Sequence, residues 1–154
     1  MPERELNIND VVFVSFDLGI NDATSLTFSA INQRTKKLEI IYHYHNRNEP
    51  TKHYISIIHD FMAAHKLNKD NLRLILPHDA KNRHDAIETL VSREKAYKDA
   101  GFKVQVLSQV DVNKAIETTR AAIQHHQLIF AKNNNIEEFI SFLKEYEWKI
   151  NKLT

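Results

Sequence analysis

The chain contains no cysteine, and only two of its 154 residues are glycine. The absence of cysteine excludes a disulfide framework, a thiol nucleophile and every zinc site built on thiolates. Because Gly19 and Gly101 are the only glycines, the chain holds neither a Walker phosphate loop nor a GxGxxG dinucleotide fingerprint. The composition therefore excludes a P-loop ATPase.

Long apolar runs are also missing. No run approaches the roughly 20 residues that span a bilayer, and the N-terminus lacks the apolar core of a signal peptide. The net charge is only +1, from 21 Lys and Arg against 20 Asp and Glu, which leaves room for a local basic patch but not for a uniformly basic surface. This length and composition predict one folded domain without a membrane span, in a reducing, intracellular setting.

The first third of the chain predicts three strands, because β-branched and aromatic residues alternate with short polar connections. The strands are expected over residues 11–18, 25–32 and 38–45. The first of them, VVFVSFDL, is apolar on both faces, which is typical of a central strand. Turns this short join antiparallel neighbours, so the three strands should form a meander.

The rest of the chain alternates between helical and strand patterns. In order, the patterns predict a helix over 51–66, a strand over 72–77, a helix over 85–99, a strand over 102–108 and two helices near 112–123 and 136–143. Thr51 is the expected N-cap of the first helix, and Gly101 the expected stop of the second. Right-handed crossovers then place the first and fourth strands side by side and parallel. The expected fold class is α/β, a mixed sheet with helices on both faces, in the element order of the ribonuclease H-like fold.

Two acidic residues lie where that fold would bring strand ends together. Asp17 is near the end of the first strand, and Asp79 directly follows the fourth. Neighbouring strands are about 4.8 Å apart, so two carboxylates at matching heights can hold divalent ions between them. Oxygen ligands favour Mg²⁺ or Mn²⁺ over Zn²⁺. Taken singly, Asp17 is also typical of a turn residue, and Asp79 is also typical of a helix N-cap or a loop residue.

Three segments resemble, in order and spacing, the nuclease domain of the large terminase subunit of tailed bacteriophages. They are FDLGINDAT (16–24), LPHDAKNR (76–83) and GFKVQVLSQVDVNKAIETTR (101–120). The resemblance extends over roughly residues 11–148. It implies a ribonuclease H-like fold and a metal-dependent endonuclease that cuts concatemeric viral DNA with two Mg²⁺ or Mn²⁺ ions. In this family the acids that match Asp17 and Asp79 are catalytic and bind metal.

The family also has a third acid near an Asp-Ala-x-Arg-Tyr signature, which this sequence does not contain. Asp22, Asp111 and Glu117 are candidate substitutes. A site that lacks one carboxylate should bind metal weakly, so the isolated domain is expected to be a poor nuclease. By this resemblance residues 1–10 are a linker remnant and residues 11–154 a nuclease domain truncated at its C-terminus.

Other polar residues have two interpretations each. His78 is either a partner that orients Asp79 or an ordinary loop residue. The cationic residues near the site either contact the DNA backbone or are simply solvated; they are Lys81, Arg83, His84, Lys114 and Arg120. His43 and His45 share a strand face, but without a third ligand they fit edge packing with Tyr42 and Tyr44 better than a zinc site.

The resemblance also implies partners and a location. The partners are double-stranded DNA, the portal protein, the small terminase subunit and an ATPase domain of the same full-length chain, in the cytoplasm of the infected bacterial host and without a membrane. Two alternatives stay open: another ribonuclease H-like nuclease, such as a junction resolvase or a transposase-like enzyme, and a docking module for DNA or portal with vestigial acids.

Overall fold

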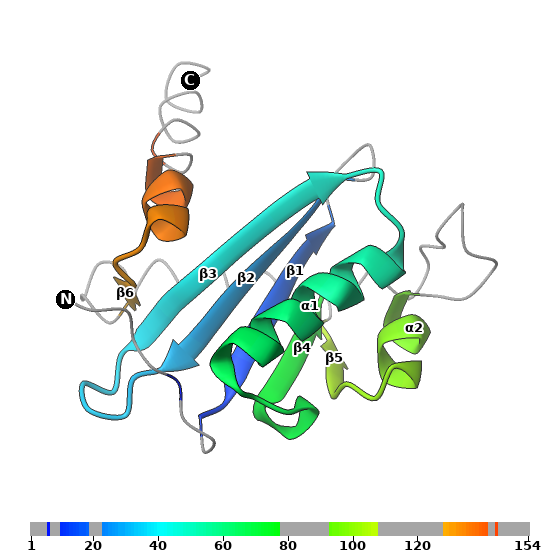
Figure 1. Cartoon of the computed structure of the whole chain (residues 1–154), viewed down its shortest axis with the longest axis horizontal. Coiled ribbons are helices and arrows are strands. Elements are labelled where there is room, and N and C mark those ends of the chain that lie inside the picture. Colours follow the sequence, from blue (N-terminus) through cyan, green and yellow to red (C-terminus); the bar gives the residue numbers. More distant parts are fainter. Residues whose placement is uncertain are drawn as a thin grey trace.

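A single mixed sheet organises the protein (Figure 1). The computed structural model describes residues 6, 10–18, 23–77, 93–107, 128–141 and 144. Within these residues the sheet has six strands in the order β5-β4-β1-β2-β3-β6. The strands are β1 (Val12–Leu18), β2 (Ala23–Ile31), β3 (Leu38–Arg47), β4 (Leu72–Leu76), β5 (Val104–Val106) and β6 (Leu128–Phe130).

The strand directions confirm the predicted meander and crossover. β1 pairs antiparallel with β2, and β2 pairs antiparallel with β3. β4 pairs parallel with β1, and β5 pairs parallel with β4. The first and fourth strands are therefore parallel neighbours, as the helical connection between them requires.

β6 was not predicted. It pairs parallel with the start of β3, with Leu38 opposite Leu128. Its three residues, LIF, are too few for periodicity to distinguish a strand from a helical turn. The expectation of two helices at the end of the chain therefore overlooked a strand, and the expected helix near 112–123 lies outside the described residues.

The described helices are α1 (Thr51–His65), the 3-10 helix η2 (Lys69–Asn71) and α2 (Arg93–Asp99), and residues 134–141 are also helical. The predicted N-cap of α1 is wrong. Pro50 occupies the cap position with extended backbone and no side-chain cap, whereas Thr51 is the first helical residue and is buried. A proline before the first turn already supplies the φ that the helix entry needs, and the Thr51 side chain is taken up in packing.

Gly101 ends α2 as predicted. Its φ is +94°, a conformation that favours glycine. The Gly101 amide donates to the Lys98 carbonyl (2.9 Å), and the Phe102 amide donates to the Tyr97 carbonyl (3.2 Å). This pair of hydrogen bonds is the Schellman motif, which satisfies the last carbonyls of a helix. The predicted start of this helix, with Asp85 and Glu88, lies outside the described residues.

The main core lies between the sheet and α1. Alternate residues of β1 (Val12, Val14 and Phe16) are buried on this face. On β2, Phe28 packs against Phe61 of α1 with ring centroids 4.3 Å apart. Tyr97 of α2 packs against Phe16 with centroids 4.9 Å apart, so α2 covers the same face.

The opposite face carries the helical residues 134–141. His43 alternates with Tyr42 and Tyr44 on β3, so it points away from α1, and its ring stacks on Phe139 with centroids 4.1 Å apart. The prediction of helices on both faces is thereby confirmed.

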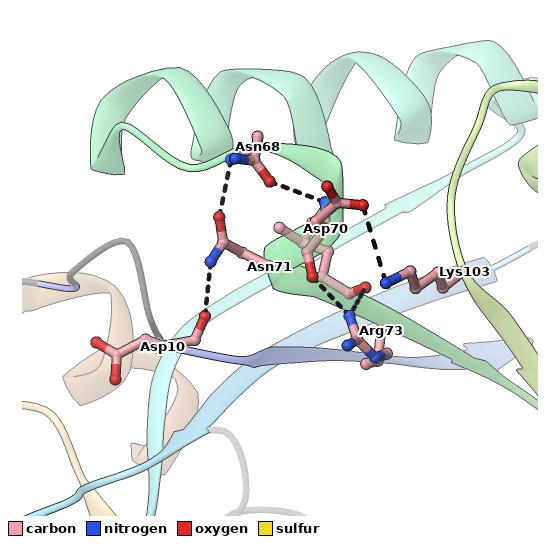
Figure 2. Close-up of polar contacts among 7 residues, drawn as sticks. Asp10, Asn68, Asp70, Asn71, Arg73 and Lys103 are labelled. Atoms are coloured by element: carbon pink, nitrogen blue, oxygen red, sulfur yellow. Dashed lines mark hydrogen bonds and ion pairs between the residues drawn. The ribbon is translucent and has the colours of Figure 1, made fainter.

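A polar cluster ties the amino ends of β1 and β4 together (Figure 2). The side-chain nitrogen of Asn71 donates to the backbone carbonyl of Asp10 (3.0 Å). The side-chain oxygen of Asn71 accepts from the backbone amide of Asn68 (3.1 Å). Arg73 donates to the backbone carbonyl of Asp70 (2.8 Å). These contacts align the start of β4 with the start of β1, and the parallel pairing carries that alignment toward the carboxyl ends of both strands.

Asn135 attaches the second helical layer to β3. Its side-chain oxygen accepts from the His43 amide (2.8 Å), and its side-chain nitrogen donates to the His43 carbonyl (2.6 Å). The side-chain amide of Asn135 thus forms the two hydrogen bonds to His43 that the backbone of a neighbouring strand would otherwise form at this edge of β3. We expect Asn135→Ala to cost about 1–2 kcal/mol in unfolding free energy, since two hydrogen bonds to backbone are lost.

Hydrogen exchange provides the measurement. In Asn135→Ala the His43 amide should exchange faster, while amides of β1 keep their protection. Asn135→Asp is the matched variant, because it retains the acceptor for the His43 amide and loses only the donor. Unchanged exchange at His43 in Asn135→Ala would contradict this role.

Candidate active site

Asp17 lies on the exposed face of the sheet at the carboxyl end of β1. Val14 and Phe16 face the core, so Ser15 and Asp17 point to the opposite side, and both are exposed. Asp17 pairs with Ser25 of β2, which keeps it within the regular ladder rather than in a loop. Asp17 is thus an outward-facing strand carboxylate, and the turn after it, which it was also expected to cap, lies outside the described residues.

β4 runs beside this carboxylate in the same direction. The parallel register pairs Ser15 with Ile75, and continuing it two residues brings Asp17 level with Pro77. Asp79 follows Pro77 by two residues and lies outside the described residues. The structure therefore confirms the strand arrangement on which the two-carboxylate hypothesis depends, whereas the Asp17–Asp79 distance stays a prediction.

The other predicted site residues also lie outside the described part of the chain. They are Asp22, His78, Lys81, Arg83, His84, Asp111, Lys114, Glu117 and Arg120. Among the described residues there is no group of three His, Cys, Asp or Glu side chains placed to hold a metal ion. Asp17 is the only one of the proposed ligands that the described residues include.

On its β2 side, Asp17 has polar neighbours along the sheet face. Register places Ser25 beside Asp17, and His45 of β3 beside Ser25, in one row across three strands. A second row joins Ser15, Thr27 and His43. Sequence reasoning identified the shared face of His43 and His45, but it did not place that face beside Asp17; the alternation of Ser and Thr along 23–31 was the available signal.

His43 is the inner member of the histidine pair. Its Nδ1 lies 3.2 Å from the Thr27 hydroxyl, and the two imidazole centroids of His43 and His45 are 5.7 Å apart. Burial, and then the nearby His45 ring, lowers the pKa of His43 to about 4. His43 is packed, as predicted from the sequence, but against Thr27 and Phe139. Tyr42 and Tyr44 point to the other face, toward α1.

This lowered pKa predicts acid sensitivity. The unfolded chain takes up a proton on His43 below about pH 6.5, whereas the folded chain does so only near pH 4. Unfolding therefore becomes easier as the pH falls through that window. After allowance for partial exposure we expect a loss of about 1 kcal/mol at pH 4.5.

Urea denaturation at pH 7 and pH 4.5 measures this loss. His43→Phe keeps an aromatic ring against Phe139 and removes the titrating group, so it should lose less stability between the two pH values than the native chain. An equal loss in both proteins would assign the acid sensitivity to other groups.

The core face at this end of the sheet contains a buried cation. Arg93, the first residue of α2, is 6% exposed, and its Nη1 donates to the Thr24 hydroxyl at 3.4 Å. Thr24 pairs with Leu18, the residue after Asp17. Tyr54 of α1 lies near Thr24 and Arg93, and burial is the main cause that raises its pKa. Arg93 thus anchors α2 to the strand end that carries Asp17.

No helix among the described residues is long and apolar enough to cross a membrane. Comparison with protein-family models and with curated proteins finds no match.

Solved structures of phage large terminases are similar to this chain. The large terminase of a thermophilic bacteriophage superposes with a TM-score of 0.65 and 14% identity, over 89% of this chain and 32% of that one. The complex of the same terminase with ADP gives a TM-score of 0.66 and 15% identity, over 92% and 32%. The P22 large terminase nuclease domain gives a TM-score of 0.61 and 16% identity, over 92% and 74%.

The chain spans about a third of the length of the thermophilic-phage terminase that it matches. In contrast, it spans most of the isolated P22 nuclease domain. The likeness therefore corresponds to one part of a large terminase. The chain has the ribonuclease H-like α/β fold of a large-terminase nuclease domain.

Proposed function

We propose that this chain is the nuclease domain of a viral DNA-packaging terminase and that it hydrolyses DNA phosphodiesters with two divalent metal ions. One observation carries the proposal: Asp17 is exposed at the carboxyl end of β1, directly beside the parallel strand that leads to Asp79. In open α/β sheets, functional sites gather beyond the carboxyl ends of strands. The similarity to terminase nuclease structures supports the same assignment.

The donor chemistry fits Mg²⁺ or Mn²⁺. Asp17 and Asp79 supply carboxylate oxygens, which these hard cations prefer. When bound, the metal ions generate a hydroxide nucleophile from water and stabilise the leaving oxygen of the scissile phosphodiester. The chain itself contributes a fixed carboxylate: Asp17 sits on a strand paired on both sides, so its position changes little when substrate binds.

The remaining residues complete the proposed site. His78 orients Asp79, and the third acid is one of Asp22, Asp111 or Glu117. Lys81, Arg83, His84, Lys114 and Arg120 hold the DNA backbone, whose phosphates carry no base information. Sequence preference should therefore be low.

The larger assembly follows from the same proposal. The thermophilic-phage neighbours are large terminases about three times as long as this chain, one of them with ADP bound. We assign to this protein an ATPase domain in the same polypeptide, joined through residues 1–10, and double-stranded DNA, portal protein and small terminase subunit as partners. The site of action is the cytoplasm of the infected bacterium.

Isothermal titration calorimetry with Mn²⁺ tests the metal site. The native chain should bind Mn²⁺, and both Asp17→Ala and Asp79→Ala should weaken that binding at least tenfold, since each removes an anionic ligand. Asp60→Asn, at an exposed position of α1, is the control and should bind as the native chain does. Binding that is absent, or unchanged in both site variants, leaves only a docking module.

A further inference from the structure

The sheet face around Asp17 carries polar side chains on two neighbouring strands. Antiparallel strands such as β1 and β2 commonly bury one face and present polar residues on the other. Here β1 and β2 present Ser15, Asp17, Ser25 and Thr27 on the face opposite α1, and Ser15 and Asp17 are exposed. These side chains place hydroxyl and carboxylate groups beside the proposed site, at the strand end beyond the half-buried Phe13 on the same face.

The polar face ends in basic residues on β3. His45 is level with Asp17 across Ser25, and Arg47 follows on the same face, opposite Ala23. Both are exposed. Adjacent strands are about 4.8 Å apart, so His45 lies about 10 Å from Asp17. The ladder between them thus holds the Asp17 carboxylate and the His45 imidazole at a fixed separation.

The helical residues 134–141 leave this end of β3 accessible. Phe139 covers the His43 ring, whereas the next residue on that face, His45, is exposed. A cavity of about 400 Å³ opens here, lined by His43, His45, Glu138 and four further residues. The surface is therefore hollowed beside the histidine pair, and Glu138 adds a carboxylate to the lining.

We infer that Ser15, Asp17, Ser25, His45 and Arg47 form one track for a DNA backbone, here called the β1–β3 track. This inference rests on the proposed function, since it takes Asp17 as the point of cleavage. His45 and Arg47 hold phosphates about 10 Å or more from the scissile one. The Ser25 hydroxyl donates to a phosphate oxygen between them, and the Ser15 hydroxyl donates to the backbone beside Asp17.

The chemistry of the track favours a polyanion over a protein partner. Hydroxyl and cationic donors are the groups that contact phosphate and sugar in DNA complexes. A protein interface would instead place aromatic or aliphatic anchors at its centre, and the centre of this row is Ser25.

Fluorescence anisotropy with a labelled DNA duplex in Ca²⁺ tests the track on the whole chain. Arg47→Ala should weaken binding about three- to tenfold near 0.1 M salt and lower the slope of log K against log salt by about 0.9, the value for one phosphate contact. His45→Ala should also weaken DNA binding. Glu138→Gln should strengthen it about twofold, because it removes a negative charge beside the track.

Arg34→Ala is the matched control. Arg34 is an exposed arginine in the turn at the other end of β2 and β3, so its removal changes net charge equally. It should change affinity less than twofold. Two duplexes of different sequence should respond alike to Arg47→Ala, because a backbone contact reads no bases. Equal affinities of Arg47→Ala and Arg34→Ala, or a response confined to one duplex, would overturn the track.

The two hypotheses fail separately. If Mn²⁺ binding depends on Asp17 but Arg47→Ala behaves like Arg34→Ala, the track is wrong and the nuclease assignment stands. If Arg47→Ala weakens DNA binding but the native chain binds no Mn²⁺, the surface binds DNA and the nuclease assignment is wrong.

Discussion

Asp17→Ala is expected to abolish nicking of supercoiled plasmid DNA in the presence of Mn²⁺. The substitution removes a carboxylate from the proposed metal site and leaves the fold intact, because the side chain is exposed and makes no core contact. Metal ions supply several kcal/mol of transition-state stabilisation in phosphodiester hydrolysis. A loss of about a thousandfold or more corresponds to at least about 4 kcal/mol of that stabilisation.

Plasmid nicking followed on agarose gels at millimolar Mn²⁺ and high protein concentration measures the rate. Asp17→Asn should be as inactive as Asp17→Ala, because the isosteric amide lacks the charge. Asp60→Asn, the same change on an exposed turn of α1, should nick at the native rate. If Asp17→Ala retains nicking within a factor of ten of the native rate, Asp17 is not a catalytic residue here.

The sequence predicted the elements whose physical signal is local. β1 alternates apolar residues toward α1, and α1 repeats Tyr54, Ile58 and Phe61 on one face, so both patterns extend over enough residues to be read. Antiparallel pairing of β1 with β2 followed from a short connection, and parallel pairing with β4 followed from a helical one. The adjacency of Asp17 to the strand before Asp79 was predictable for the same reason.

Features set by distant contacts were not predictable. β6 is a strand because it meets β3, about 90 residues earlier in the chain, and three residues carry no period of their own. Asn135 binds the His43 backbone across 92 residues. Thr51 fits a capping pattern but is buried instead. The row from Asp17 to His45 depends on the register of three strands, and periodicity alone does not specify register.

The second large effect is expected in the core on the other side of the same sheet. Leu74 is fully buried in the middle of β4, between Val14 of β1 and Val104 of β5. Leu74→Ala removes apolar contacts and leaves a cavity in a closely packed site, which costs roughly 3–4 kcal/mol in unfolding free energy. Since small domains are stable by only about 5–15 kcal/mol, this single change should remove a large share of the total.

Ile75→Ala is the matched control for that loss, because the two residues are adjacent on one strand and point to opposite faces. Ile75 is half-buried on the face opposite α1, so its truncation should cost roughly 1 kcal/mol. Urea denaturation compares the two variants through their midpoints at constant slope. Equal losses would contradict a main core on the α1 face. A smaller loss for Ile75→Ala would mean that most of the stability comes from the core under α1. The opposite face, where Asp17 lies, is then free to carry polar residues for binding.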